Sequence, residues 1–266
     1  INEFMDSKIS FENGAHSMDR ISEDIEFKNV TLTYPDTGIV AVKDVSFTIP
    51  KGSKTAIIGE TASGKSTIAY LLMQMYRPTA GEILVGDKNI SEYSIKNWRN
   101  HIGYVPQDSF LFSDSVSNNI GFGLKEDYVQ DEVERYAAYA SVHEDILSLP
   151  KTYETVVGER GVTLSGGQKQ RISIARSLIG EPDLLILDNS LSAVDTDTEL
   201  KIASYLNSFD EDKTMVIITQ RINNIFQYDQ IITMSEGRVI EHGSHEELMA
   251  ANGYYWGLWR KMNGEG

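Results

Sequence analysis

A short glycine-rich segment, residues 59–67, constrains the fold of this chain more than any other feature of the sequence. It reads Gly-Glu-Thr-Ala-Ser-Gly-Lys-Ser-Thr and fits the pattern G-x-x-x-x-G-K-[ST]. The apolar run 55–58 precedes it, and Ile68, Leu71 and Leu72 follow it at helical spacing. Strand, loop and helix in this order predict an α/β fold whose loop holds an anion. The alternative, a glycine-rich turn formed by chance, does not explain the Lys-Ser pair at its end.

The loop offers both backbone and side-chain groups to a phosphate. Its glycines let the backbone curl so that successive N–H groups and the helix N-terminus point at the anion. Lys65 adds positive charge at the β- and γ-phosphates of a nucleoside triphosphate, and the Ser66 hydroxyl is placed to bind Mg²⁺. Ala62 stands where a third glycine is usual but keeps its N–H. The predicted nucleotide-binding residues of the loop are Gly59, Glu60, Thr61, Ala62, Ser63, Gly64, Lys65, Ser66 and Thr67.

Asp188 provides a second part of the same predicted site. It follows the apolar run 184–187, and further apolar runs occur at 215–218 and 231–234. Such runs predict buried strands of a mainly parallel sheet. Because ligands bind at the carboxyl ends of the strands in open α/β sheets, Asp188 is predicted to hold a Mg²⁺-bound water.

The remaining pattern extends this core. Residues 25–34 alternate apolar and polar side chains, and the alternation returns at 45–49, which predicts antiparallel strands. From about residue 108 to residue 170 the pattern is mostly helical and polar, and we expect an inserted helical subdomain there. Ser244 and Glu247 form a capping box ahead of one last predicted helix. That helix is predicted to carry Leu248, Tyr255, Trp256 and Trp259.

The composition disfavours several classes of function. A formal net charge of −15 and a pI near 4.7 leave no basic surface for a polyanion, so nucleic-acid binding is not expected. The absence of cysteine excludes disulfides and thiolate metal sites, and it suits a reducing compartment. No apolar run is long enough to cross a bilayer. We therefore expect a soluble chain on the cytoplasmic side of a membrane.

The amino-terminal residues are predicted to be a connector. The chain begins at Ile1, without an initiator methionine or a leader-like apolar stretch, and we expect it to be a piece of a longer protein. Residues 1–24 are polar and irregular, and strand-like alternation begins only after them. A partly ordered tail is the alternative.

A second glycine-rich segment, residues 164–168, precedes a helical pattern over residues 169–179. It reads Leu-Ser-Gly-Gly-Gln, so a serine and two glycines stand at a predicted helix N-terminus, where backbone N–H groups bind anions. One triphosphate does not need two such sites in the same chain. The residues of this second predicted site are Leu164, Ser165, Gly166, Gly167 and Gln168.

With these motifs in this order, residues 25–262 resemble the nucleotide-binding domain of ABC-type ATPases, in which the pentapeptide 164–168 is the signature motif. The resemblance implies a P-loop NTPase domain of the α/β class that uses ATP and Mg²⁺, with a RecA-like core, an antiparallel β-subdomain and a helical subdomain. It assigns Tyr34 to adenine stacking and Gln107 to Mg²⁺ binding and contact with a membrane domain. It also places Asp195 in the D-loop.

The same resemblance implies an exporter. Residues 158–161 resemble the X-loop of exporters, and residues 1–24 resemble the segment that joins the last membrane helix to this domain. The implied partners are a transmembrane domain of the same transporter and a second nucleotide-binding domain. In the family, two such domains meet head to tail, so that each ATP lies between one chain's phosphate loop and the other chain's signature motif. The acidic chain opposes the alternative of an ABC ATPase that acts on DNA or ribosomes.

Two positions depart from the family pattern. Asn189 follows Asp188 where the family has a glutamate that polarises the attacking water, and Gln220 stands in place of the switch histidine. Neither side chain accepts a proton, although Gln220 still donates a hydrogen bond. Together the two residues resemble the hydrolysis-impaired half of a heterodimeric exporter. The alternatives are an Asn189 that replaces a natural carboxylate, and a regulatory nucleotide sensor without turnover.

Overall fold

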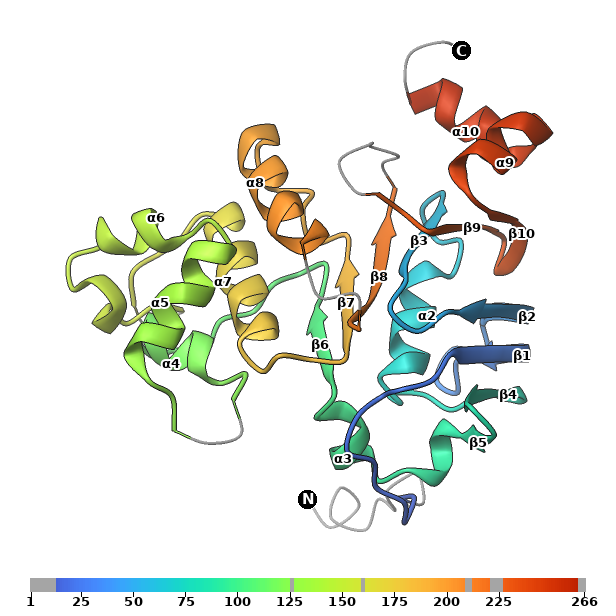
Figure 1. Cartoon of the computed structure of the whole chain (residues 1–266), viewed down its shortest axis with the longest axis horizontal. Coiled ribbons are helices and arrows are strands. Elements are labelled where there is room, and N and C mark those ends of the chain that lie inside the picture. The colour runs from blue at the N-terminus through green and yellow to red at the C-terminus, as the bar shows by residue number, and fades with distance from the viewer. Residues whose placement is uncertain (1–12, 125–126, 159–160, 209–211, 221–226, 263–266) are drawn as a thin grey trace.

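The computed structural model describes residues 13–124, 127–158, 161–208, 212–220 and 227–262 (Figure 1). These residues form two β-sheets and the helices that cover them. A six-stranded sheet lies at the centre, a four-stranded sheet packs on one of its faces through an intervening helix, and further helices cover the other face. The predicted α/β class is confirmed.

The six-stranded sheet carries the apolar runs predicted as buried strands. Its order is β10-β9-β3-β8-β7-β6, and β10 alone of these runs antiparallel to its neighbour. Leu184 and Ile186 face one hydrophobic cluster whereas Leu185 and Leu187 face the other, so both faces are buried and the runs are continuously apolar. The strands are β3 (Lys54–Gly59), β6 (Ile102–Val105), β7 (Leu184–Asp188), β8 (Thr214–Thr219), β9 (Gln230–Ser235) and β10 (Arg238–Gly243).

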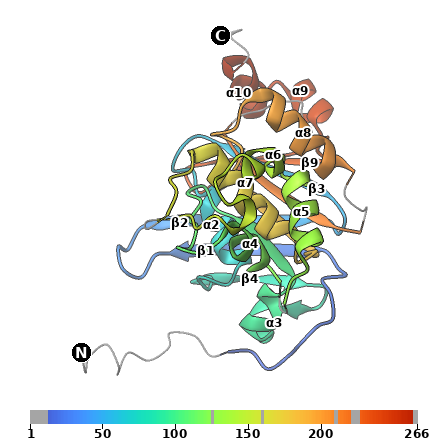
Figure 2. The same ribbon diagram turned by 90° about the vertical axis from the view of Figure 1, so that its left-hand side faces the viewer.

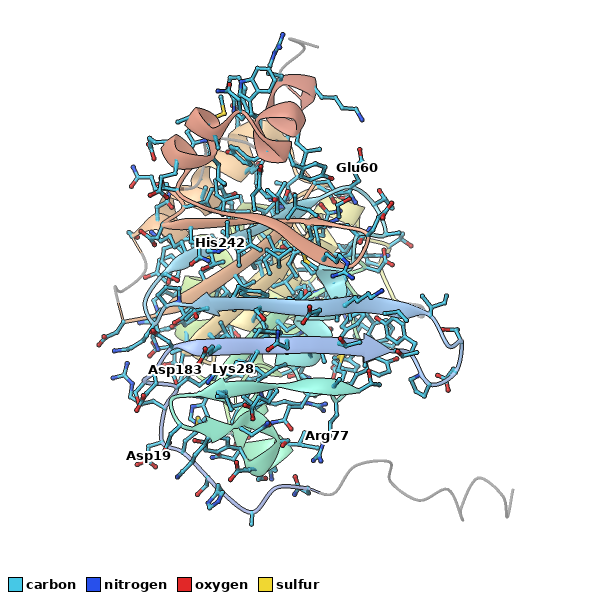
Figure 3. The ribbon with its side chains drawn as sticks, turned by 90° about the vertical axis from the view of Figure 1, so that its right-hand side faces the viewer. Asp19, Lys28, Glu60, Arg77, Asp183 and His242 are labelled. Carbon is cyan, nitrogen blue, oxygen red and sulfur yellow. The ribbon has the colours of Figure 1, made fainter. Side chains whose placement is uncertain are left out.

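The four-stranded sheet confirms the predicted antiparallel strands. Its order is β2-β1-β4-β5, and Figure 3 looks onto it with Lys28 labelled beside β1. The helix that follows the glycine-rich loop, α2 (Lys65–Leu72), packs between the two sheets through Ile68, Leu71 and Leu72. The strands are β1 (Ile25–Thr33), β2 (Val40–Ile49), β4 (Ala80–Val85) and β5 (Lys88–Asn89), and the short helices η1 (Ile90–Glu92) and α3 (Ile95–Arg99) follow.

The chain between β6 and β7 is helical, as predicted from its pattern. Its helices lie together at the left of Figure 1 and face the viewer in Figure 2. They share a hydrophobic cluster with Leu185, Leu187, Met215 and Ile217 of the central sheet. They are α4 (Val116–Gly121), α5 (Gln130–Tyr139), α6 (His143–Leu147), η2 (Thr152–Glu154) and α7 (Gly166–Leu178), and α8 (Thr196–Asn207) follows β7 on the same face.

The carboxyl-terminal part departs from the prediction of one last helix. The capping box of Ser244 and Glu247 is present, but it begins a short helix, α9 (His245–Ala251), which is followed by a separate helix, α10 (Tyr254–Met262). Asn252 ends α9 with a left-handed φ of 51°, a conformation that stops an α-helix. No helix in the described part of the chain is long and apolar enough to span a membrane.

The described part of the amino-terminal segment, residues 13–24, is irregular, as expected. It nonetheless lies against the domain: Asn97 exchanges two hydrogen bonds with the backbone of Met18, at 2.8 and 3.1 Å, and the Ile21 N–H donates to Asp183 at 3.0 Å. Ile21 is fully buried. The segment therefore reaches β1 along a fixed path on the surface of the domain.

Candidate nucleotide-binding site

A cavity of about 490 Å³ lies at the carboxyl ends of β7 and β8, beside the loop that follows β3. It brings together residues that are far apart in the sequence. The sequence-predicted residues that line it are Tyr34, Thr61, Ala62, Ser63, Gly64, Lys65, Ser66, Thr67, Gln107, Asp188, Asn189 and Gln220. Gly59 and Glu60, from the beginning of the same loop, line a neighbouring open groove instead.

The loop backbone has the shape that an anion requires. Gly64 is the N-cap of α2 with a φ of 95° and makes no side-chain cap hydrogen bond, so the first turn of the helix is not satisfied by a side chain. The first N–H groups of an α-helix have no partner within the helix, and the helix dipole favours negative charge there. A Cβ at Gly64 would stand 2.6 Å from the Ala41 carbonyl oxygen, which explains the glycine. Ala62 adopts a left-handed φ of 63°.

Lys65 lies folded onto its own loop. Its ammonium donates to the carbonyl oxygens of Gly59 and Glu60, at 2.9 and 2.6 Å, and to the Ser63 hydroxyl at 3.1 Å. Burial lowers the pKa of Lys65, whereas the charges of Asp188 and Glu60 oppose that shift. A buried cation held by neutral oxygens is well suited to exchange them for phosphate oxygens.

Oxygen donors for a divalent cation stand next to this lysine. The Ser66 hydroxyl donates to Asp188 Oδ1 at 3.1 Å, and Gln107 lines the same cavity. Burial raises the pKa of Asp188, and the Ser66 hydrogen bond and the charge of Lys65 lower it in opposition. Hydroxyl, amide and carboxylate oxygens are the ligands that Mg²⁺ takes beside phosphates, so these residues fit that ion.

The end of the cavity at Tyr34 is aromatic and apolar. The Tyr34 hydroxyl bonds to Thr67 Oγ1 at 3.0 Å, and its ring meets Tyr76 edge-on with centroids 4.9 Å apart and planes at 80°. This ring is thereby held in one orientation. Seven further lining residues were not predicted as site residues: Ile39, Val40, Ala41, Ile218, Thr219, Glu236 and Gly237.

Of these missed residues, Gly237 has a local signal in the sequence, because a glycine between two apolar segments indicates a turn. The Gly237 N–H donates to the Ser63 carbonyl oxygen at 3.2 Å, and the Gly237 carbonyl accepts from Lys43 at 2.8 Å. The turn is present, with a φ of 76° at Gly237. Nothing in the local pattern indicates that this turn folds back onto the phosphate loop.

Asn189 and Gln220 flank the cavity where the family pattern has a base and a histidine. Asn189 adopts a left-handed φ of 49°, and its N–H donates to the Ile218 carbonyl at 2.8 Å. The Thr61 hydroxyl donates to Gln220 Oε1 at 3.4 Å. Among the described residues that line the cavity, the carboxylates are Asp188 and Glu236.

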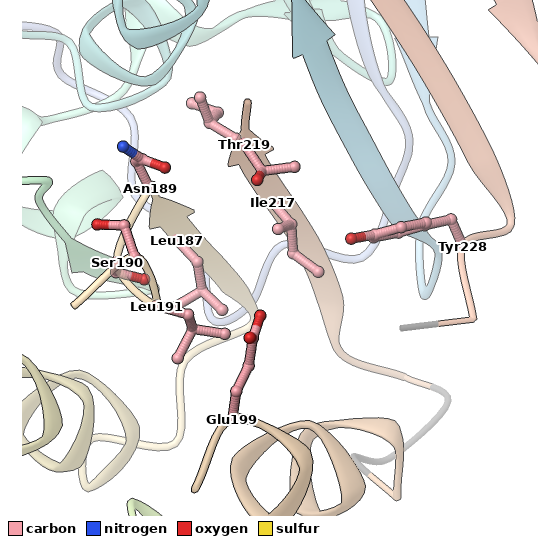
Figure 4. Close-up of a pocket in the computed structure, with 10 residues that line it drawn as sticks. Leu187, Asn189, Ser190, Leu191, Glu199, Ile217, Thr219 and Tyr228 are labelled. Carbon is pink, nitrogen blue, oxygen red and sulfur yellow. The ribbon is translucent and has the colours of Figure 1, made fainter. Parts of the chain in front are cut away.

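A second, much smaller cavity of about 30 Å³ lies beneath Asn189 (Figure 4). Figure 4 shows Asn189 at one end of its lining and Glu199, from α8, at the other. Glu199 is buried, as is Ser190 beside Asn189. The turn after β7 is therefore packed from below by α8.

The second glycine-rich segment does not line the nucleotide cavity. Ser165 is the N-cap of α7 and accepts from the Gln168 N–H at 3.2 Å, while the Gln168 side chain accepts from the Ser165 N–H at 3.0 Å. Leu164 is buried, but Ser165 and Gly166 are exposed. A Cβ at Gly166 would meet only Ala193 Cβ, at 3.9 Å, so this helix N-terminus is open at that side.

Asp195 also lies at an exposed helix N-terminus. Its carboxylate caps α8 by accepting from the Thr198 N–H at 3.0 Å, and hydrogen bonds from Thr198 lower the pKa of Asp195. Of the segment predicted as an X-loop, Gly158 and Gly161 are described, whereas Glu159 and Arg160 lie outside the described residues, as does Arg221 after Gln220.

Comparisons with known proteins agree on one family. The model of the ABC transporter family matches residues 42–192, more than half of the 266 residues. The chain is 38% identical over 263 residues to an ATP-dependent lipid A-core flippase of Photobacterium profundum, covering 99% of this chain and 45% of the flippase. It is 42% identical over 238 residues to ATP-binding cassette sub-family B member 6 of Xenopus tropicalis, covering 90% of this chain and 28% of that protein.

A solved structure extends the likeness to three dimensions. A bacterial Atm1-family ABC exporter with ATP bound superposes with a TM-score of 0.90 at 35% sequence identity, over 97% of this chain and 45% of the exporter chain. The chain thus spans less than half the length of these relatives. The resemblance to the nucleotide-binding domain of ABC exporters is confirmed, and the chain belongs to the ABC transporter family.

Proposed function

We propose that this chain is the ATP-binding domain of an ABC exporter at the cytoplasmic face of a membrane, in which ATP-driven closure against a partner domain powers export. The observation that carries the proposal is the single cavity lined by Lys65, Ser66, Asp188 and Tyr34. A cation, a pair of oxygen donors and an oriented aromatic ring at one site match the phosphates, the Mg²⁺ and the base of ATP. Residues 25–266 would be this domain, with a helical subdomain at about 108–170 and residues 1–24 as the connector to the membrane part.

Each part of the cavity has a task in this proposal. The loop N–H groups and Lys65 bind the β- and γ-phosphates, with the Lys65 ammonium exchanging the carbonyls of Gly59 and Glu60 for phosphate oxygens. Ser66, Gln107 and Asp188 hold Mg²⁺, Asp188 through a water, and the ion supplies charge neutralisation at the phosphates when it is bound. Tyr34 stacks on the base.

The same cavity is expected to hydrolyse ATP poorly. Asn189 is a neutral amide next to Asp188, so the water at the γ-phosphate lacks a proton acceptor at that position. A general base typically contributes about 10²- to 10⁴-fold to a rate. Gln220 can donate a hydrogen bond to the γ-phosphate but carries no titratable charge.

The exposed signature motif, in contrast, is expected to serve the partner. Ser165 and Gly166 are open to solvent at the N-terminus of α7, and residues 164–168 do not line this chain's own cavity. A head-to-tail pair would put them over the nucleotide of the second domain, whose loops we expect to be intact. We therefore propose a heterodimer in which the sites are unequal. A regulatory nucleotide sensor is the second candidate, favoured by Asn189 and Gln220.

An exposed aromatic surface supports contact with a membrane-spanning part. Phe110, Phe112 and Phe122, here called the aromatic cluster, are 62%, 40% and 66% exposed and pack against one another. The cluster follows Gln107 closely in the chain. Contiguous apolar surface of this kind marks a protein contact, and the relatives contain more than twice the length of this chain. We propose the transmembrane domain of the same transporter as the occupant.

Titration with a fluorescent ATP analogue tests the binding function. Lys65→Ala removes the charge at the phosphates and is expected to weaken affinity by about tenfold or more, equivalent to ~1.4 kcal/mol. Tyr34→Ala removes the stacking face and is expected to weaken it as well, while Tyr34→Phe keeps the face and serves as the matched control. Unchanged affinity in both alanine variants would refute the assigned cavity.

A further inference from the structure

Arg176, on the helix that begins with the signature motif, makes an unusual set of contacts with the aromatic cluster. Its guanidinium donates to the Phe110 carbonyl at 2.9 Å, to the Asn119 carbonyl at 2.7 Å and to Asn119 Oδ1 at 2.7 Å. It also stands 5.3 Å from the centroid of the Phe112 ring. One side chain of α7 therefore contacts two members of the aromatic cluster, Phe110 through its backbone carbonyl and Phe112 through its ring.

The charge of Arg176 is neutralised by no carboxylate in the described part of the chain. Its acceptors there are neutral oxygens, and burial lowers the pKa of Arg176 to about 10. A buried guanidinium is costly unless it is fully hydrogen-bonded, so its three bonds fix the positions of the groups that accept them.

Asn119 completes the connection. It is 1% exposed, its Oδ1 accepts from the Phe112 N–H at 2.9 Å, and its Nδ2 donates to the Phe112 carbonyl at 3.0 Å. The amide thus pairs with Phe112 as a neighbouring strand would, while the same Oδ1 also accepts from Arg176. Arg176 and Asn119 together hold the backbone on both sides of the exposed Phe112 ring.

The contacts of Arg176 and Asn119 connect the segment that leads to the nucleotide cavity with the helix that begins at the signature motif. Gln107, at the nucleotide cavity, precedes Phe110 by three residues, and α7 leads from Arg176 back to Gly166 at its exposed N-terminus. We infer that Arg176 is a positioning residue that makes the Gln107 segment, the aromatic cluster and α7 move as one body. The inference rests on the proposed function, because it assumes that a nucleotide bound in the cavity contacts Gln107 and shifts it.

A lysine at position 176 is not expected to perform the positioning role of Arg176. An ammonium is a point charge on a flexible stem, whereas the planar guanidinium reaches three acceptors in fixed directions and stacks on a ring. Arg171 is a matched control on the same helix, since its guanidinium also donates to a backbone carbonyl, that of Ser141, and pairs with Asp145 at 2.8 Å. These contacts of Arg171 lie away from the cluster, so Arg171→Lys makes the same chemical change at another place on α7.

A single fluorescent probe beside the aromatic cluster reports whether the cluster moves when nucleotide binds. The sequence contains no cysteine, so Ser113→Cys, an exposed and nearly isosteric change next to Phe112, provides one labelling site for an environment-sensitive dye. MgATP is expected to change the emission of this probe in the parent and in Arg171→Lys. In Arg176→Lys the change should fall at least about fivefold, with the affinity for the fluorescent ATP analogue retained.

The outcomes separate the inference from the proposed function. An Arg176→Lys protein that keeps most of the emission change, or an Arg171→Lys protein that loses as much, overturns the role of Arg176. A parent that binds the analogue without any emission change also overturns it, whereas a parent that binds no analogue overturns the proposed function. If Arg176→Lys does not fold, Phe112→Leu removes the ring that Arg176, Phe110 and Phe122 contact but leaves the hydrogen bonds of Arg176 in place. It should reduce the emission change, and an undiminished change counts against the inference.

Discussion

Individual side chains decide which chemistry the nucleotide cavity supports. Asp188 is a buried carboxylate bonded to Ser66, and its neighbour Asn189 is a neutral amide in a left-handed conformation. Non-glycine residues rarely adopt that conformation, and asparagine is among those that tolerate it best. The turn after β7 thus accommodates an amide with little strain, and we propose that a site with this amide binds nucleotide better than it hydrolyses it.

Mg²⁺-dependent nucleotide affinity is expected to decline on acidification. Burial raises the pKa of Asp188 above its ordinary value of 3.8. The carboxylate is therefore available to Mg²⁺ above the raised pKa and is lost to a proton as the pH falls through it, which begins at a higher pH than for an exposed aspartate. Titrations of the ATP analogue with and without Mg²⁺ across the acidic range measure this effect.

The control for that titration is Asp188→Asn, which has no proton to exchange and should show little Mg²⁺ dependence at any pH. A parent protein whose Mg²⁺ dependence stays constant down to the ordinary aspartate pKa would show that Asp188 does not hold the ion.

The isolated chain is expected to bind MgATP but to hydrolyse it very slowly, because two copies of it would only pair two sites that lack the base. Introducing Asn189→Glu together with Gln220→His supplies a proton acceptor and a titratable group. We expect the rate of ATP hydrolysis to rise toward the roughly 10²- to 10⁴-fold that a general base contributes, provided that a signature motif can contact the site. A steady-state phosphate-release assay measures both proteins. Fast ATP hydrolysis by the unmodified chain would refute the hypothesis of an impaired site.

Among the secondary-structure elements, α10 depends on one distant carboxylate. Glu241, on β10, accepts from the N–H groups of Tyr254 and Tyr255 at 2.9 and 2.8 Å, and so caps α10. A Cβ on Gly253 would stand 1.7 Å from Glu241 Oε1, so only glycine leaves room for this cap. The break between α9 and α10 is thus built from Asn252, Gly253 and Glu241.

Removing the cap should loosen α10 alone. Glu241→Ala leaves two backbone N–H groups without their acceptor and is expected to cost about 1 kcal/mol, as the loss of a helix cap typically does. Hydrogen exchange of residues 254–262 should accelerate, while exchange in α2 stays unchanged. The matched control is Glu246→Ala, an exposed carboxylate on α9. Unchanged exchange in α10 of the Glu241→Ala protein would show that another contact holds the helix.

The elements that sequence reasoning predicts are those with a continuous apolar run or an alternating pattern over much of their length. The continuous apolar runs of β3, β7, β8 and β9 and the alternation of β1 and β2 are of that kind. By contrast β6 has four residues, and its Gly103 lets α7 approach so closely that a Cβ there would lie 2.5 Å from the Ser177 carbonyl. A segment of four residues that includes a glycine is too short to show the periodic pattern from which a strand is predicted.

The same limit applies to the site. Residues within the glycine-rich loop are predictable because the motif specifies them, and Asp188 because it ends an apolar run. Ile39, Val40 and Gly237 line the cavity only because the β1–β2 connection and the turn after β9 fold onto the loop, and that packing is a property of the sheet order. Local sequence does not contain the sheet order.

For the whole molecule, the functional surfaces of one chain are expected to belong to different ATP sites. The phosphate loop faces the chain's own cavity, whereas Ser165 and Gly166 are exposed on α7. If the domains meet head to tail, a defect at Asn189 affects one site and a defect at Gly166 affects the other. Variants at these two positions therefore test the crossed arrangement.

Gly166→Asp is the more specific test of the crossed arrangement. A Cβ at Gly166 has room in this chain, with Ala193 Cβ 3.9 Å away as its nearest neighbour, so the added carboxylate should disturb the partner's nucleotide rather than the fold. At Gly167 a Cβ would stand 2.9 Å from the Ala193 carbonyl, and Ser165→Arg would break the capping box, so both changes combine structural effects with functional ones.

The most direct measurement is the steady-state ATPase rate of the reconstituted transporter pair, with either Gly166→Asp or Asn189→Ala in this chain. We expect Gly166→Asp to abolish ATPase activity while fluorescent ATP still binds at Lys65. Asn189→Ala is expected to change the rate little, because that position already lacks a base. A pair carrying Asn189→Ala that loses as much activity as the pair carrying Gly166→Asp would contradict both the crossed arrangement and the impaired site.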